Sequence, residues 1–90
     1  MEHELKILPE YFQAVSDGNK TFELRRDDRG FKTGDSLLLR EWESGSYTGR
    51  NLYCDVKYVL KGFKGLDPDY AILAISVHSQ STYTNDCGGK

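Results

Sequence analysis

The sequence predicts a small, mainly β domain of the α+β class, with five mostly antiparallel strands curled into a barrel and one short N-terminal helix. Three observations lead to this prediction. Five segments carry strand patterns, one segment carries helical spacing, and 90 residues suffice for one modest hydrophobic core. A barrel is preferred to an open α+β sandwich because closure of the sheet removes its exposed edges.

The first strand is predicted over residues 2–8. Leu5 and Ile7 alternate with charged residues in this segment, which is typical of a strand with one buried face. His3 has the same parity, so we expect its side chain beside the core. It would act there either as a satisfied structural residue or as a hydrogen-bond partner or general base near neutral pH.

A short amphipathic helix is predicted over residues 9–17. Pro9 is favoured at a first helical position, and Glu10 suits the positive end of the helix dipole. Apolar residues follow with helical spacing, and Gly18 is a typical C-terminal stop. The helix is therefore expected to lead directly into the second strand.

The second strand, residues 21–26, has a pattern that bears on function. Phe22 and Leu24 share one face, and the polar and charged side chains project from the other. Two interpretations follow from this spacing. The charged face is either solvated, or it lines a groove in which Glu23 and Arg25 pair and present guanidinium donors to a phosphate or a base edge.

Three further strands complete the predicted sheet, at residues 36–42, 51–60 and 70–77. The glycine-containing segments 43–50 and 61–69 are predicted to be connections between them. The last segment, residues 78–90, is small and polar. We therefore expect a flexible polar tail after a single domain of residues 1–77.

Charge and hydropathy argue against two classes of protein, non-specific nucleic-acid binders and membrane-spanning proteins. With 14 acidic and 12 basic residues the net charge is -2, which is opposite to the strongly basic surface of a non-specific nucleic-acid binder. Any nucleic-acid contact therefore needs a local basic patch. No segment is apolar enough to span a bilayer, and the N-terminus lacks the order of a secretory signal, so we expect a cytoplasmic monomer without membrane contact.

The cysteines and histidines do not form a recognisable metal pattern. Cys54 and Cys87 are expected to be free thiols, because disulfides are rare in cytoplasmic proteins. Together with His3 and His78 they match no spacing known for zinc sites. Glycine motifs for phosphate loops or dinucleotides are absent from the sequence as well. No metal and no cofactor is therefore expected.

Two neighbouring motifs make the chain similar to a known family. They are Gly18-x-Lys20-x-x-Glu23-x-Arg25 and Phe31-x-x-Gly34-Asp35. With these motifs, residues 2–77 resemble the ASCH domains, which belong to the PUA-like superfamily of small β-barrels. A compact bacterial and phage branch of that family, which has no assigned function, is resembled by five further segments: His3-x-Leu5-Lys6-Ile7, Pro9-Glu10-Tyr11-Phe12, Asp28-Arg29, Glu41-Trp42 and Tyr47-Thr-Gly49-Arg50.

This resemblance implies a cleft that binds RNA or nucleotides and is lined by Lys20, Glu23 and Arg25. Lys20 and Arg25 would contact a phosphate or a base edge, while Glu23 would orient Arg25 or accept a hydrogen bond from an exocyclic amine. His3 is expected in the same cleft. Three further candidate ligand-binding residues are Thr21, Arg29 and Glu41.

These three candidates have different grounds. Thr21 lies on the same strand face as Glu23. Glu41 has the parity of Leu37 and Leu39, so it is expected to face inward at the strand end. Arg29 either stabilises the turn in an ion-pair cluster with Asp28 or contacts a substrate.

The resemblance leaves open whether the chain is an enzyme. Some members are amidohydrolases that remove an acyl group from the exocyclic amine of a modified cytidine, and Lys20 matches their catalytic lysine. Glu23 stands where their catalytic threonine lies, so Thr21 would have to supply the hydroxyl, and the segment with their later glutamate has no counterpart here. Other relatives are ribonucleases, for which His3 and Lys20 would form an acid–base and phosphate-binding pair. An enzyme would thus use Lys20, Glu23 and His3, and a protein-interaction module is a third alternative.

Overall fold

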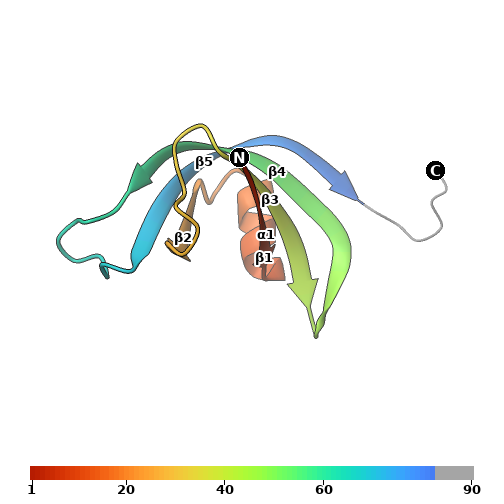
Figure 1. Ribbon diagram of the computed structural model, residues 1–90. Coiled ribbons are helices and arrows are strands. Elements are labelled where there is room, and N and C mark those ends of the chain that lie inside the picture. Colours follow the sequence, from red (N-terminus) through yellow and green to blue (C-terminus); the bar gives the residue numbers. More distant parts are fainter. Residues whose placement is uncertain (83–90) are drawn as a thin grey trace.

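The fold is one curled sheet with a single helix, as seen in a computed structural model that describes residues 1–82 (Figure 1). The elements in chain order are β1 (Glu2–Ile7), α1 (Pro9–Ser16), β2 (Phe22–Arg26), β3 (Ser36–Glu43), β4 (Ser46–Leu60) and β5 (Tyr70–Thr82). The strand order in the sheet is β1-β3-β4-β5-β2. Strand β1 runs parallel to β3, and the other neighbours are antiparallel. The predicted fold class, mainly β with one N-terminal helix, is confirmed.

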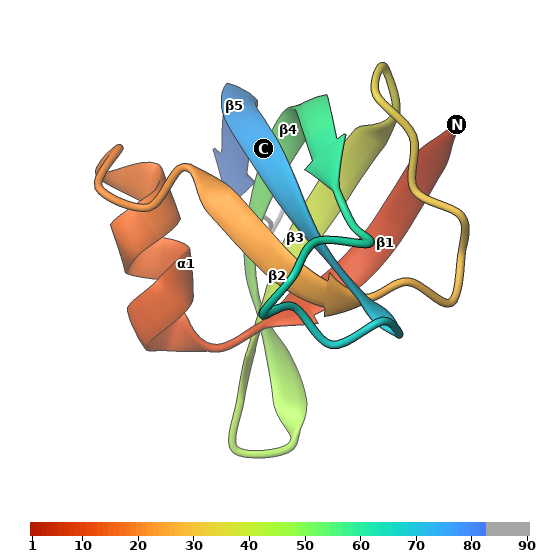
Figure 2. The ribbon, with the colours of Figure 1, turned by 90° about the vertical axis from the view of Figure 1, so that its left-hand side faces the viewer.

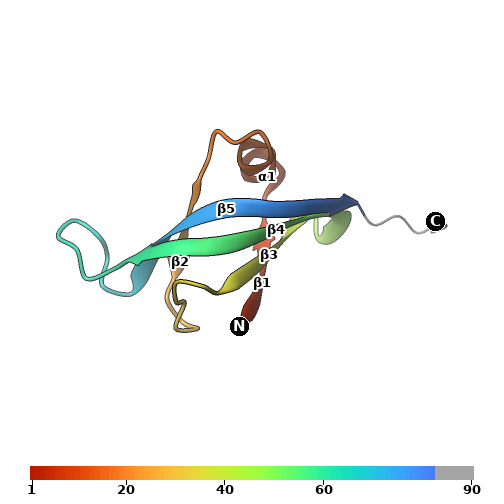
Figure 3. The same cartoon turned by 90° about the horizontal axis from the view of Figure 1, so that it is seen from above.

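The sheet curls into a half-barrel around the helix. Figure 1 shows the sheet arching over α1, and Figure 2 shows α1 as the connection from one edge strand, β1, to the other, β2. The long ribbon of β4 and β5 crosses the molecule (Figure 3). Helix α1 buries Phe12 and Val15 on the concave side of the sheet. Within residues 1–82, no helix covers the convex side.

Two arginine side chains, Arg25 on β2 and Arg29 in the turn after it, bond to the backbone of the other edge strand, β1. Arg25 Nη2 donates to the carbonyl oxygen of Lys6 at 2.7 Å, and Arg29 Nη1 donates to that of Glu4 at 2.8 Å. Both carbonyls belong to β1, which forms a ladder with β3 and with no other strand in the described part of the chain. On this side the expected barrel is therefore closed by side chains and not by strand pairing.

The hydrophobic core lies inside the curl and follows the predicted alternation. Leu5 and Ile7 are buried on β1, and Leu39 of β3 pairs directly with Leu52 of β4. Residues paired in this way share a face of the sheet, so both leucines point into the core. Burial of each such side chain stabilises the fold by about 1.5–3 kcal/mol relative to exposure.

The hairpin between β3 and β4 is tighter than predicted. Ser44 and Gly45 have φ values of 53° and 86°. Two positive φ values are typical of a two-residue type I′ turn, whose twist matches that of the flanking strands. Because the turn needs only two residues, most of the predicted connection over residues 43–50 is strand, and β4 begins at Ser46.

Strand β5 is also longer than predicted. It continues to Thr82, and residues 79–82 pair with residues 50–53 of β4. The prediction of a flexible tail from residue 78 is therefore wrong for residues 78–82, because backbone hydrogen bonds to β4 hold polar residues in a strand as well as apolar ones. The rest of the predicted tail, residues 83–90, lies outside the described residues.

A buried histidine–aspartate pair joins β1 to the turn before β3. His3 Nε2 lies 2.9 Å from Asp35 Oδ2, and the His3 ring packs edge-on against Phe31 with the centroids 4.7 Å apart. The same Asp35 oxygen accepts a hydrogen bond from the backbone amide of Lys32 at 2.9 Å. The hydrogen bond from His3, supported by this amide, holds the pKa of Asp35 below its ordinary value of 3.8 in spite of burial.

This lowered pKa has a consequence for stability at acid pH. The ionised carboxylate of Asp35 stabilises the fold above pH 3.8, and this contribution is lost as the pH falls from there through the lower native pKa. We expect Asp35→Asn to lower the free energy of unfolding at neutral pH by about 1–3 kcal/mol. The dependence of stability on pH should also be shallower below about pH 5 in this variant.

Urea unfolding across this pH range is the measurement. The exposed Asp28 provides the matched control, since Asp28→Asn removes the same charge at a carboxylate that lies 3.7 Å from Arg29 on the surface. Pairs of this kind contribute little, so the control should behave like the parent chain. Parallel pH profiles for Asp35→Asn and the parent chain would contradict the role given to Asp35.

Cys54 is a free, buried thiol on β4. Burial raises its pKa to about 11, so little of the reactive thiolate is present at neutral pH. Cys87, the other predicted free thiol, lies outside the described residues.

This burial should protect Cys54 from thiol reagents. In a Cys87→Ser variant, which leaves Cys54 as the one thiol, we expect the reaction with Ellman's reagent to be at least about tenfold slower in the folded chain than in urea. The absorbance of the released thiolate follows the rate. Equal rates in both states would mean that Cys54 is accessible in the native fold.

Candidate functional site

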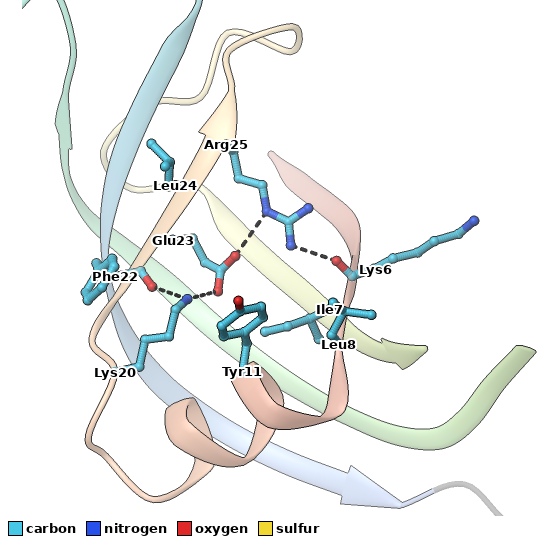
Figure 4. Close-up of a pocket in the computed structure, with 9 residues that line it drawn as sticks. All are labelled: Lys6, Ile7, Leu8, Tyr11, Lys20, Phe22, Glu23, Leu24 and Arg25. Atoms are coloured by element: carbon cyan, nitrogen blue, oxygen red, sulfur yellow. Dashed lines mark hydrogen bonds and ion pairs between the residues drawn. The ribbon is translucent and has the colours of Figure 1, made fainter. Parts of the chain in front are cut away.

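A pocket of about 400 Å³ lies between the two edge strands, where the sheet is not closed. Its walls come from the end of β1, the start of α1, and β2 with the residues just before it (Figure 4). The lining residues are Lys6, Ile7, Leu8, Tyr11, Lys20, Phe22, Glu23, Leu24 and Arg25. Natural small-molecule sites have volumes of about 300–1,000 Å³, so the pocket has the size of a ligand site.

Strand β2 directs its charged face into the curl of the sheet. Phe22 and Leu24 are 48% and 52% exposed, whereas Glu23 is only 4% exposed. Glu23 pairs directly with Leu73, which is fully buried, and paired residues share a face of the sheet. Of the two interpretations of this strand, the solvated charged face is therefore wrong, and Glu23 faces inward.

Two cations compensate the buried carboxylate of Glu23. Lys20 Nζ donates to Glu23 Oε2 at 2.5 Å, and Arg25 Nε donates to Glu23 Oε1 at 3.0 Å. Each cation also donates to a backbone carbonyl at 2.7 Å, Lys20 to that of Phe22 and Arg25 to that of Lys6. Within residues 1–80, no buried side-chain nitrogen or oxygen lacks a hydrogen-bond partner. The charge is thus tolerated inside the fold because it is both paired and hydrogen-bonded.

The turn after α1 positions Lys20 beside Glu23. Gly18 has a φ of 83°, a conformation that glycine adopts without the steric cost of a side chain. The amides of Asn19 and Lys20 both donate to the carbonyl oxygen of Ala14 at 3.0 Å. The chain thus leaves the helix in a fixed direction, and this gives the glycine of the motif a structural role.

An apolar wall faces the charged cluster. Ile7 and Leu8 come from the junction of β1 and α1, and Tyr11 comes from the first turn of the helix (Figure 4). Leu8 and Tyr11 are about half exposed, so this wall is accessible from solvent. The Tyr11 ring centroid lies 5.8 Å from Lys20 Nζ. Apolar walls with a few convergent polar groups are typical of sites for small organic ligands.

The structure assembles three of the predicted site residues, Lys20, Glu23 and Arg25. His3 is not among the residues that line the pocket, since its ring is held by Asp35. The acid–base pair of His3 and Lys20 expected for a ribonuclease is therefore not assembled in this structure.

The remaining predicted site residues also lie outside the pocket lining. Thr21 is exposed just before β2. Arg29 bonds to the β1 backbone and lies 3.7 Å from Asp28, as in the turn-stabilising alternative. Glu41 does face inward as predicted, where its carboxylate accepts a hydrogen bond from Thr48 Oγ1 at 2.6 Å.

The apolar wall was not predicted from the sequence. Leu8 and Tyr11 fall within the predicted first strand and helix, and nothing in their spacing points to the strand that they face. The available signal was local: Tyr11 precedes the fully buried Phe12, so its side chain lies on the flank of the helix. Which element this flank meets depends on how α1 packs.

The cluster is built from ammonium, guanidinium and carboxylate groups. Among residues 1–82, no three side chains of His, Cys, Asp or Glu gather as metal ligands. The described part of the chain also contains no helix that is long and apolar enough to cross a membrane.

Comparison with known proteins relates this site to a family. A family model described as "Domain of unknown function (DUF3850)" matches residues 2–75, which include every pocket-lining residue. The chain is 38% identical over 71 residues to the "Uncharacterized 12.9 kDa protein in GpA 3'region" of Escherichia phage P2. This match covers 79% of the chain and 64% of the phage protein, so the chain spans less than two thirds of that relative. The chain therefore belongs to the DUF3850 family of domains of unknown function.

Proposed function

We propose that this domain binds RNA or a nucleotide in the pocket between β1 and β2. The observation that carries the proposal is the Lys20–Glu23–Arg25 cluster, which meets an apolar wall in a pocket of about 400 Å³. A nucleotide combines an anionic phosphate with a flat base that has a polar edge. The pocket offers cations for the phosphate or the base edge and an exposed aromatic ring, Tyr11, for stacking.

The charge distribution agrees with a local site. The chain as a whole is acidic, with a net charge of -2. The pocket, in contrast, has two cationic side chains at one carboxylate, and so an excess of one positive charge in the cluster. This local excess favours an anionic ligand without the basic surface that non-specific nucleic-acid binding requires.

A relationship between the DUF3850 family and the ASCH domains is part of the same proposal. The three charged residues of the motif Gly18-x-Lys20-x-x-Glu23-x-Arg25 all line the pocket, and its glycine forms the turn before them. This supports the view that the family is a compact relative of the ASCH domains of the PUA-like superfamily. In those domains the corresponding cleft is the one expected to bind RNA or nucleotides.

We favour binding over catalysis. The acid–base partner expected for a ribonuclease, His3, is engaged with Asp35 and does not line the pocket. Thr21, which would supply the hydroxyl of an amidohydrolase, also lies outside the lining. An acyl-cytidine hydrolase or a ribonuclease is therefore the weaker alternative. Product formation from an acylated cytidine or an RNA, abolished by Lys20→Ala, would support it.

A specific observation also favours the third candidate, a protein-interaction module. Phe22 and Leu24 lie about half exposed on the outer face of β2, and Tyr58 of β4 is 61% exposed. Phe22 and Tyr58 both pair with Ala74 of β5, so they share one face of the sheet. Exposed apolar groups gathered on one face are typical of protein contacts.

Substitution of Lys20 tests the proposed nucleotide site. We expect Lys20→Met to weaken the binding of nucleoside monophosphates at least about tenfold, because a charged hydrogen bond of roughly 1.5–3 kcal/mol is lost. Proton–nitrogen NMR titration at fixed salt measures the affinity and locates the shifts. Resonances of Tyr11, Lys20 and Arg25 should move in the parent chain.

The matched control is Lys57→Met, which removes an exposed lysine outside the pocket. Thermal unfolding of each variant separates loss of binding from loss of the fold. Unchanged affinity in Lys20→Met would remove the site assignment. The absence of nucleotide-induced shifts in the parent chain would favour a protein partner on the outer face instead.

A further inference from the structure

The charged groups in the pocket leave hydrogen-bonding capacity that the protein itself does not use. An ammonium has three donors, and Lys20 uses two of them within residues 1–80. Arg25 bonds through one hydrogen each of Nε and Nη2, so the second hydrogen of Nη2 and both hydrogens of Nη1 have no partner in the same part of the chain. Each oxygen of the Glu23 carboxylate accepts one of these bonds and has room for a second.

These unused capacities have a defined order. Figure 4 shows Lys20 on one side of Glu23 and Arg25 on the other. The hydrogen bonds of 2.5 Å and 3.0 Å keep the three groups adjacent. Because a carboxylate only accepts and the two cations only donate, a ligand meets a donor, an acceptor and a donor in sequence.

This order distinguishes the nucleobases. The imide edge of uracil and thymine presents O4 as acceptor, N3–H as donor and O2 as acceptor, which complements all three groups. Cytosine places an acceptor, N3, at the centre of its edge, and adenine places the acceptor N1 beside its amine, so neither offers a donor flanked by two acceptors. Guanine matches through O6 and N1–H, but its 2-amino group would meet a second donor.

We propose that the pocket selects the imide edge of a uracil or thymine base, with Glu23 accepting from N3–H and Lys20 and Arg25 donating to the two flanking carbonyl oxygens. This inference rests on the proposed nucleotide binding and names the base. The half-exposed Tyr11 ring and Leu8 would cover a face of the base, since both belong to the apolar wall opposite the cluster.

Burial of Glu23 is what makes the selection strong. The side chain is 5% exposed, so water has little access to replace a missing partner. A base that turns an acceptor toward this carboxylate leaves two groups of like polarity facing one another. Sites with buried polar groups discriminate sharply against ligands that leave those groups unpaired.

The test compares the affinities of nucleotides that present different base edges. Isothermal titration calorimetry of the full chain at one salt concentration would use UMP, dTMP, CMP, AMP and GMP. We expect UMP and dTMP to bind at least about tenfold more tightly than the other three, because one mismatched polar contact costs roughly that factor. The UMP and dTMP arms compare a ribonucleotide and a deoxyribonucleotide that share the same imide edge.

Two methylated nucleotides isolate the central hydrogen bond without changing the protein. In 3-methyl-UMP the N3–H is replaced, so its affinity should fall to that of CMP. In 5-methyl-UMP a methyl group of the same size leaves the imide edge intact, so its affinity should remain close to that of UMP. Equal affinities of UMP and 3-methyl-UMP would overturn the inference.

A protein variant gives an independent test of the acceptor. Glu23→Gln replaces the acceptor-only group with an amide that can donate, and we expect it to lose the preference for UMP over CMP. If this variant fails to unfold cooperatively, the methylated nucleotides still decide.

The inference and the proposed function fail in different ways. Similar affinities for all bases, or tightest binding of CMP, AMP or GMP, would overturn the base assignment and leave nucleotide binding in place. No measurable binding of any nucleotide would overturn both.

Discussion

Glu23 puts a carboxylate inside the curl of the sheet, and the arrangement of the site follows from the need to keep that charge paired. Removal of one partner from a buried ion pair costs roughly 3–5 kcal/mol, so a buried carboxylate requires well-placed cations. Lys20 reaches it from the turn after the helix, and Arg25 reaches it from the same strand. Since each cation also bonds a backbone carbonyl, the carboxylate couples the end of α1, strand β2 and strand β1.

The same cluster explains how a half-barrel keeps an opening. Paired strands lie only about 4.7–4.9 Å apart, so a ladder between β1 and β2 would leave no room for a pocket. The side chains of Arg25 and Arg29 bond instead to carbonyl oxygens of β1 and span a wider gap. The pocket of about 400 Å³ lies in this gap. Arg25 therefore contributes both to closure of the fold and to the lining of its opening.

An inward Glu23 has a consequence on the other side of β2. Successive side chains of a strand point to opposite faces, so Phe22 and Leu24 must point outward. There they adjoin Ala74 and Ile72 of β5, their partners in the register. The two faces of this short strand thus differ in chemistry, with paired charges toward the inside of the curl and apolar groups toward the outside, and residues of both faces line the pocket.

The sequence by itself determined the type and order of the elements and the identity of the charged cluster. Local periodicity reports which residues share a face, and Lys20, Glu23 and Arg25 follow a helix-ending glycine at a spacing that brings them together. Only the tertiary structure decided which face of β2 turns inward. Alternation is symmetrical between the two faces, and apolar residues are the usual inward choice unless inward charges are paired and hydrogen-bonded.

Contacts between segments far apart in the chain also decided where β5 ends, how His3 is bound and which residues face the charged cluster. Residues 78–82 are polar and give no local strand signal, yet β5 extends through them because β4 supplies a pairing partner that is distant in sequence. His3 was correctly predicted to lie beside the core, but the distant Asp35 determines that it is held away from the pocket. The packing of α1 places Tyr11 opposite the cluster. Local periodicity contains no information about these partners, because each is set by the three-dimensional packing of segments that lie far apart in the chain.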